Sequence, residues 1–177
     1  MQLGSLATVP ALGRPDLLAP SVREALGALP TAHRVGVVEI DPDLADTAAL
    51  TEAYGLPLDA SANCVVVSGK RAGEERVAAC VVRADTRADV NNVVKRMLDV
   101  RKASFHPMER AVEETGMEYG GITPVGLPAG WRLLVDAAVV DIDVAIIGSG
   151  VRRSKLLLPG SALAELPGAE VVAGLAS

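Results

Sequence analysis

Two apolar runs separated by a polar, glycine-bearing connection are the strongest constraint that this sequence places on its fold. The runs are Cys64–Val67 (CVVV) and Val77–Val82 (VAACVV), and the connection reads SGKRAGEER. β-branched side chains favour extended backbone, and a glycine within a short polar segment favours a turn. The sequence therefore predicts an antiparallel hairpin with an exposed loop.

Helices and strands are both expected outside this hairpin. Ser21 and Glu24 are spaced as a capping box at the start of the first helix. Strands outnumber helices and do not alternate with them one for one, which predicts an α+β fold with a mixed, strongly curved sheet. Capping and stop signals place helices at residues 21–29, 46–54, 89–98, 107–115 and 161–166, and apolar runs place strands at 34–40, 103–106, 131–136, 143–147, 155–158 and 170–173.

Length and charge limit the number of domains and the classes of partner that this chain can have. The 177 residues favour one domain over residues 21–177, preceded by an N-terminal arm, residues 1–20, that contains three prolines. A net charge of −5 disfavours a protein whose whole surface binds DNA, but a local basic patch stays open. The most apolar stretch, residues 133–147, contains three aspartates, so no membrane span is expected. No signal peptide is visible, and we expect a cytoplasmic protein.

The cysteines and histidines do not form a recognisable metal motif. Cys64 and Cys80 are 16 residues apart, and His33 and His106 are the only imidazoles. We therefore expect two buried thiols, no metal and no cofactor.

The segment Gly120–Gly126 (GGITPVG) is the first candidate for chemistry. Its three glycines and one proline force a bent backbone that exposes N–H groups without side-chain cover. Such a loop can bind a carbonyl oxygen or a developing oxyanion. A tight turn between a helix and a strand is the alternative interpretation of the bare pattern.

The second candidate is Gly148–Lys155 (GSGVRRSK), a glycine turn followed by three cations within four residues. It can form a small anion-binding nest, or it can be the turn of a hairpin. Ser149 does not lie in a GxSxG motif, which disfavours a serine hydrolase. The third candidate is a basic cluster, Lys95-Arg96 with Arg101-Lys102, which fits either a helix C-terminus or a contact with a nucleic-acid backbone.

Three segments of the chain together resemble the YbaK/EbsC family, which includes the editing domain of bacterial prolyl-tRNA synthetases. They are NCVVVSGKRAGEERVAACVV, EETGMEYGGITPVG and VAIIGSGVRRSKLLLP, in the family's order and spacing over roughly 110 residues. The resemblance implies an α+β fold with a barrel-like sheet and flanking helices. It also implies a trans-editing deacylase with no cofactor, which hydrolyses the ester of a mischarged aminoacyl-tRNA carrying a small amino acid.

The resemblance also implies a set of site residues. Gly120 and Gly121 would act through backbone groups of the loop, together with the terminal ribose hydroxyl of the tRNA. Asn63 stands where the family usually has a lysine, so a phosphate contact there would lose its charge-assisted part. The residues expected to bind substrate are Asn63, Ile122, Thr123, Pro124, Gly126, Asp136, Ser149, Gly150 and Arg152, with Arg152 on a phosphate.

Three functions follow from these residues. The first is a freestanding deacylase, whose expected partners are the tRNA acceptor end and an aminoacyl-tRNA synthetase, with no DNA and no membrane. The second is a non-catalytic module that binds a tRNA end or a small ligand, suggested by Asn63. The third is a hydrolase of another small ester or thioester that uses the same loop.

Overall fold

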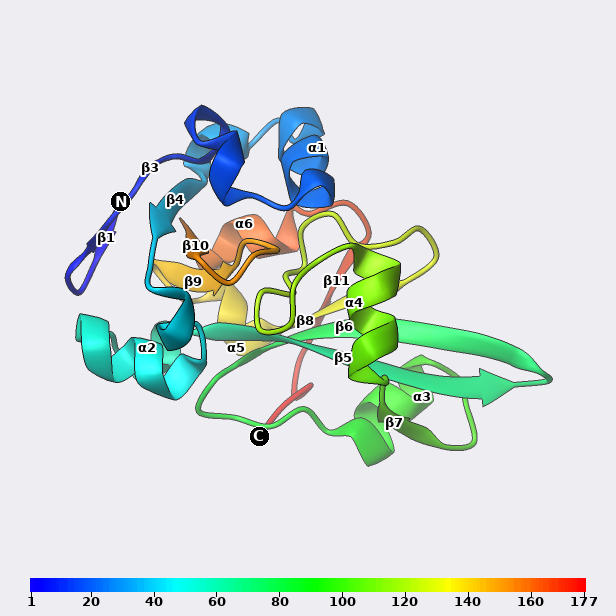
Figure 1. Ribbon diagram of the computed structural model, residues 1–177. Helices are drawn as coiled ribbons and strands as arrows, with labels where there is room; N and C mark the ends of the chain where they lie inside the picture. The colour runs from blue at the N-terminus through cyan, green and yellow to red at the C-terminus, as the bar shows by residue number, and fades with distance from the viewer.

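The computed structural model describes residues 1–177, and most of its strands belong to two sheets (Figure 1). One is antiparallel, with the order β3-β4-β10-β9, and the other is mixed, with the order β11-β8-β6-β5-β7; β1 and β2 pair separately. The strands are β1 (Gln2–Leu3), β2 (Leu6–Ala7), β3 (Val9–Pro10), β4 (Gly36–Glu39), β5 (Ala62–Arg71), β6 (Glu74–Arg83), β7 (Ala103–Phe105), β8 (Arg132–Asp136), β9 (Ala145–Gly148), β10 (Ser154–Leu158) and β11 (Ala169–Val172).

The predicted hairpin is confirmed as β5–β6, and its strands are longer than the apolar runs. The polar residues between those runs continue the pairing as far as Arg71 and Glu74. Only Ala72 and Gly73 form the turn, with φ of 51° and 85°. Two residues with positive φ give the tight turn whose twist matches that of the flanking strands.

The helices are short, and none is long and apolar enough to cross a membrane. The expected capping box is wrong, because Pro20 starts the first helix and Ser21 lies inside it, where its hydroxyl donates to the Thr115 carbonyl at 3.3 Å. The helix expected over 89–98 is a π-turn followed by a short α-helix. The helices are α1 (Pro20–Ala28), α2 (Thr47–Tyr54), α3 (Lys95–Met97), α4 (Met108–Thr115), α5 (Ala137–Val140) and α6 (Gly160–Ala164), with the π-turn η6 (Val90–Val94) and the 3-10 turns η1 (Ala11–Gly13), η2 (Pro15–Leu17), η3 (Ala32–Arg34), η4 (Pro42–Leu44) and η5 (Leu58–Ala60).

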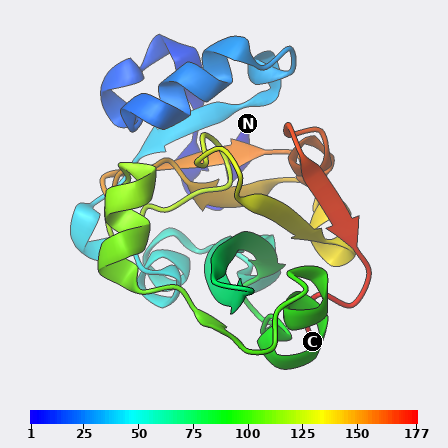
Figure 2. The same cartoon turned by 90° about the vertical axis from the view of Figure 1, so that its right-hand side faces the viewer.

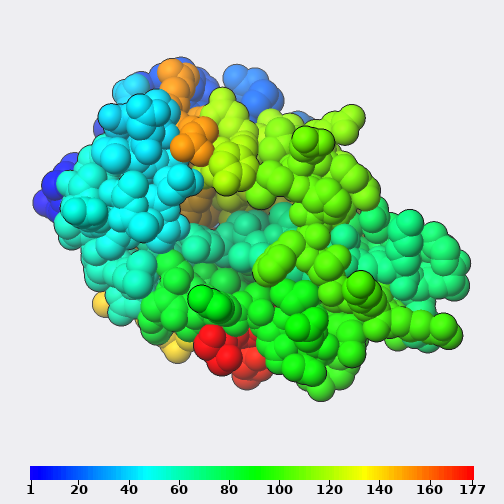
Figure 3. All heavy atoms as spheres, turned by 60° about the horizontal axis from the view of Figure 1, so that its bottom comes forward, coloured from blue at the N-terminus to red at the C-terminus, as the bar shows by residue number.

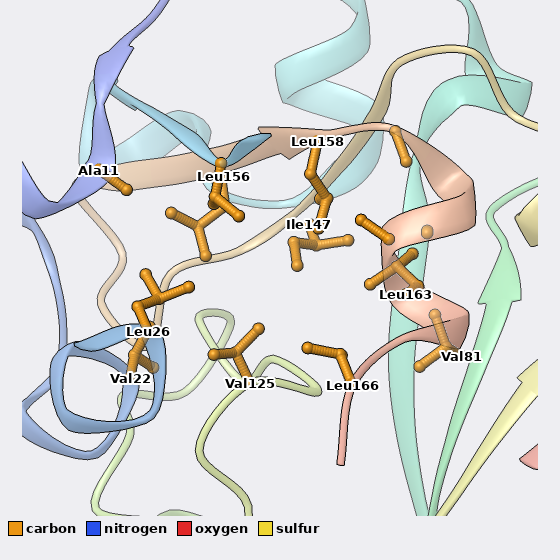
Figure 4. Packing of buried hydrophobic residues seen from close by; sticks show 14 of the residues in the cluster. Ala11, Val22, Leu26, Val81, Val125, Ile147, Leu156, Leu158, Leu163 and Leu166 are labelled. Carbon is orange, nitrogen blue, oxygen red and sulfur yellow. The ribbon is translucent and has the colours of Figure 1, made fainter. Parts of the chain in front are cut away.

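The core is divided by the alternation of side chains along the strands. Ile147 and Leu156 point to one face of the four-stranded sheet, where they join the largest cluster with Leu26 of α1 (Figure 4). Ile146 and Leu157 point to the opposite face and pack in the cluster beneath α2. Both faces of β9–β10 are therefore covered, which holds the ends of these strands in place.

The N-terminal segment, expected to be a loosely packed arm, is packed against the domain. β3 pairs with β4, and Leu17 and Leu18 are buried in the largest cluster. Figure 2 shows the blue helical layer formed by this segment and α1 over the four-stranded sheet. Pro15 and Pro20 begin a 3-10 and an α-helical turn, and Pro10 ends strand β3, so the segment is not a loose arm.

The two sheets meet where β9 lies beside the start of β5. An isolated parallel bridge pairs Ser61 with Ile146 at this junction. The α+β class is confirmed; the strands form two sheets joined at this bridge, and a closed barrel is not confirmed.

Candidate functional site

A cavity of about 350 Å³ opens at the junction of the two sheets. In Figure 3 it is the hollow between the cyan, teal and yellow-green segments, with darker orange atoms at its floor. The orange atoms belong to the β9–β10 region, which contributes Gly148 and Lys155. The other lining residues come from four segments. They are residues 45–47 before and at the start of α2, residues 62–66 of β5, the β7–α4 region (Phe105, His106, Met108 and Ala111), and the loop residues Tyr119, Gly120 and Ile122.

The glycine-rich loop forms one wall of this cavity. Gly120 has a φ of +77°, a conformation that glycine adopts without strain. The N–H groups of Gly120 and Ile122 donate to no protein acceptor, whereas the Gly121 N–H donates to the Glu118 carbonyl at 2.9 Å. The free backbone donors beside the cavity are therefore those of Gly120 and Ile122, because the Gly121 N–H is already used in the hydrogen bond of the turn.

The loop also approaches the β9–β10 turn too closely for side chains. A Cβ on Gly121 would lie 2.9 Å from the Val151 backbone, and one on Gly148 would lie 2.4 Å from the Gly121 carbonyl oxygen. The Gly150 N–H donates to that same carbonyl at 2.8 Å. The family resemblance implies that both segments belong to one site, and the structure brings them into direct contact.

Asn63 lies on β5 and lines the cavity. Its side-chain oxygen accepts a hydrogen bond from the Thr47 hydroxyl at 3.0 Å. This wall is therefore polar but uncharged.

Arg152 lies at the rim rather than in the cavity lining. Its guanidinium donates to the carbonyls of Tyr119 and Pro42 at 3.2 and 3.1 Å, and it lies 3.9 Å from the Asp46 carboxylate. It also lies over the Tyr119 ring. Arg152 thus joins the segment before α2 to the glycine-rich loop. Asp46 is the N-cap residue of α2, as its position at the start of the predicted helix 46–54 suggests, but its side chain makes no capping hydrogen bond.

Lys155 is a cavity residue that sequence analysis named only as part of a cationic cluster. It is 7% exposed, and its ammonium donates to the Ala45 carbonyl at 2.8 Å. Burial lowers the pKa of this ammonium from 10.5 to about 8; the nearby Asp46 carboxylate opposes the shift and Arg152 adds to it. The signal in the sequence is the single charge in a strand, SKLLL, whose residues are all buried.

His106 is a second cavity residue without an assigned role. It is 5% exposed, and neither ring nitrogen makes a hydrogen bond. Nε2 lies 3.4 Å from the Glu114 carboxylate, and the ring meets Trp131 edge to face at 5.7 Å between centroids. The sequence gives no catalytic partner for this histidine, and no group of three histidine, cysteine or carboxylate side chains is arranged to hold a metal ion.

The other expected substrate-binding residues lie outside the cavity lining. Thr123 is fully buried, and its hydroxyl has no hydrogen-bond partner. Pro124 and Gly126 line a different cavity, of about 460 Å³, beside α1. Asp136 is buried and accepts hydrogen bonds from the Ala138 and Ala176 N–H groups at 2.8 and 2.9 Å, so it caps α5 and fixes the C-terminal segment.

Ser149 and Gly150 hold the β9–β10 turn in place on the side away from the cavity. Ser149 is fully buried, and its hydroxyl lies 2.7 Å from that of Ser154. A Cβ on Gly150 would lie 2.3 Å from Cβ of Ala19. These contacts fix the position of the turn against α1 and leave the Ser149 hydroxyl away from the cavity.

Comparisons with known proteins address the family and the fold. The family model described as the aminoacyl-tRNA editing domain matches residues 41–166. No curated protein matches the chain. The solved structure of the hypothetical protein APE2540 has a TM-score of 0.76 and 24% identity, covering 89% of this chain and 99% of its own.

A proposed trans-editing enzyme for prolyl-tRNA synthetase has a TM-score of 0.72 and 23% identity, covering 88% of this chain and 97% of its own. At these identities, the two solved structures show the fold. The family match spans the cavity, the glycine-rich loop and the β9–β10 turn. The chain belongs to the aminoacyl-tRNA editing domain family, to which the YbaK/EbsC resemblance pointed.

Proposed function

We propose that this protein hydrolyses the ester bond between a small amino acid and a tRNA that wrongly carries it. The observation that carries the proposal is the cavity wall at Gly120 and Ile122, whose backbone N–H groups have no protein acceptor. Membership of the editing family supports the reaction class.

The reaction needs little side-chain chemistry, because an aminoacyl ester is already activated. Water adds to the ester carbonyl carbon, and the carbonyl π electrons move onto oxygen. Collapse of this intermediate expels the ribose oxygen, which takes a proton that the water brought; the products are the amino acid and the tRNA hydroxyl. Backbone donors at Gly120 and Ile122 would stabilise the oxyanion, a contribution typically worth about 10²–10³ in rate per donor. The neighbouring ribose hydroxyl of the tRNA would help to position the water.

The size of the cavity supports a small aminoacyl group. Its volume of about 350 Å³ is near the lower end of the range usual for ligand sites. The proposed partners are the tRNA acceptor end and an aminoacyl-tRNA synthetase. One structural relative is described as a proposed trans-editing enzyme for prolyl-tRNA synthetase, which supports the second partner.

A non-catalytic binding module is the second candidate function, and Asn63 favours it. This residue is uncharged, and its side-chain oxygen is already bonded to Thr47. A site with such a wall can bind an acceptor end without accelerating hydrolysis.

The test is deacylation of a panel of mischarged tRNAs, led by Ala-tRNAPro and Cys-tRNAPro, at low salt. Turnover of one panel member, well above that of the corresponding free amino-acid ester, is the expected result. Saturable tRNA binding without turnover would establish the binding module instead. Absence of both would contradict a tRNA substrate and leave small esters as the class to assay.

Gly121→Ala tests the role of the loop in the same assay. The added Cβ would meet the Val151 backbone, so the loop must move, and we expect at least a tenfold loss of kcat in a folded protein. Gly13→Ala is the matched control, because a Cβ there meets nothing within 4 Å and φ is not positive. Full activity in Gly121→Ala with an unchanged melting temperature would contradict the loop assignment.

A further inference from the structure

Lys155 is the only lysine or arginine among the residues that line the cavity. An ammonium has three protons to donate, and the structure uses one of them, in the bond to the Ala45 carbonyl. Burying a cation with incomplete hydrogen bonding costs free energy, so such groups persist mainly where a ligand or a reaction uses them. The unused donors lie at the floor of a cavity whose Asn63 wall is uncharged.

The groups around Lys155 determine its charge. Asp46 is the only carboxylate among the lining residues, and Arg152 lies at the rim; Cys64, His106 and Tyr119 are the other titratable groups of the lining. Burial raises the pKa of the Cys64 thiol far above neutrality, so Cys64 stays uncharged. The pKa of Lys155, about 8, keeps it mainly protonated at neutral pH.

We propose that the Lys155 ammonium stabilises the oxyanion that forms on the ester carbonyl during deacylation, together with the backbone donors of the glycine-rich loop. This inference rests on the proposed function. A buried ammonium attracts the carbonyl oxygen as negative charge develops there and repels the α-ammonium group of the same substrate, which orients the aminoacyl group. Lys155 donates a hydrogen bond and keeps its proton throughout, and the oxyanion electrons return to the carbonyl when the ribose oxygen leaves.

Two analogues of an aminoacylated adenosine separate this role from simple binding. One is a 3′-alanylamido adenosine, which has a planar, neutral carbonyl. The other is the corresponding aminoethylphosphonate ester, which presents a tetrahedral anion where the oxyanion forms. Lys155→Met removes the cation and preserves the approximate volume, so we expect it to bind the phosphonate at least tenfold more weakly and the amide almost unchanged.

Lys70→Met is the matched control, since Lys70 is exposed near the tip of the β5–β6 hairpin and lines no part of the cavity. Equal losses for the two analogues, or no loss for either, would overturn the oxyanion role. If the wild type binds neither analogue, the cavity does not accept an aminoacyl adenosine, and the proposed function fails together with the inference.

The wild-type protein provides a second measurement that needs no substitution. The ratio of phosphonate to amide affinity should fall at least tenfold as the pH rises through about 8 to about 10, because Lys155 loses its proton. For this measurement both analogues are made without the α-amino group, because its pKa beside a phosphonate anion is higher than beside an amide and its titration would otherwise enter the ratio. A ratio that stays constant over this range would overturn the proposal even if Lys155→Met does not fold.

Discussion

At the scale of single residues, the burial of Lys155 has a cost that depends on pH. The folded protein holds its pKa near 8, whereas the unfolded chain restores the ordinary value of 10.5. Below pH 8 both states bind the proton and the folded state bears the full cost of burial. Between the two pKa values the unfolded state binds more protons, so the stability contributed by this group rises with pH.

Lys155→Met should therefore be more stable than the wild type near neutral pH, and this difference should shrink by about 3 kcal/mol towards pH 10.5. Urea unfolding of both proteins at about pH 7 and about pH 10 measures it. Lys70→Met, at an exposed position, should show a difference from the wild type that hardly changes with pH. A pH-independent difference for Lys155→Met would mean that the two states hold this proton equally.

The sequence identifies residues at this scale better than it assigns their roles. The glycine-rich loop and the GSG turn stand out, because glycines at such spacing indicate close backbone approach, and the structure shows that approach. Lys155 and His106 do not stand out, because their roles depend on burial against residues far away along the chain. Arg152 was expected on a phosphate, and in the structure its guanidinium is bonded to two backbone carbonyls.

At the scale of elements, local patterns predict those that are held by local hydrogen bonds. The β5–β6 hairpin and the helix that ends before Gly116 follow directly from apolar β-branched runs, turn signals and stop signals. The segment expected as a helix over 89–98 is helical from Val90 to Met97, with Asp89 as its N-cap through a hydrogen bond from the Asn92 N–H, but its first turn is a π-turn rather than an α-helical one. The capping box fails because tertiary contact with Thr115 uses the Ser21 hydroxyl.

Asp136 provides a test at the element scale, because its two hydrogen bonds join the start of α5 to the C-terminal segment. Asp136→Ala leaves the Ala138 and Ala176 N–H groups without this acceptor, so it should cost about 2 kcal/mol of stability. It should also speed hydrogen exchange at Ala176, with little change in deacylation. Asp141→Ala, an exposed aspartate at the end of α5, is the control. A large loss of kcat without a loss of stability would instead place Asp136 in the substrate site.

At the scale of the whole molecule, the cavity exists only because the two sheets meet. Its floor comes from β9 and β10, and one wall comes from β5, which belongs to the other sheet. Local sequence signals carry no information about such a junction, which is why the sequence predicts the α+β class but neither the division into two sheets nor the lining of the cavity.

The exposed basic residues before β7 lead to a prediction about how the affinity for tRNA depends on salt. Arg101 and Lys102 are exposed and immediately precede β7, which leads in about 10 Å of extended chain to Phe105 at the cavity. We therefore expect tRNA binding to weaken steeply with salt despite the net charge of −5, and the double change Arg101→Ala/Lys102→Ala to reduce the salt slope by about 2.

Arg23→Ala is the control for this prediction, since α1 and β7 lie at opposite ends of the molecule in both Figure 1 and Figure 2. Arg23 is exposed and takes part in no salt bridge, so its loss should leave the salt slope almost unchanged. An affinity that is flat between low and moderate salt would show that no phosphates are contacted.

The edge-to-face contact between His106 and Trp131 has an optical consequence. Trp131 is the only tryptophan of the chain, and the histidine that it touches lines the cavity, while the indole itself borders the second cavity. Indole emission responds to the polarity of its surroundings and to the protonation of a neighbouring imidazole. The fluorescence of Trp131 can therefore report on events in the cavity through its contact with His106, and no other tryptophan contributes to the emission.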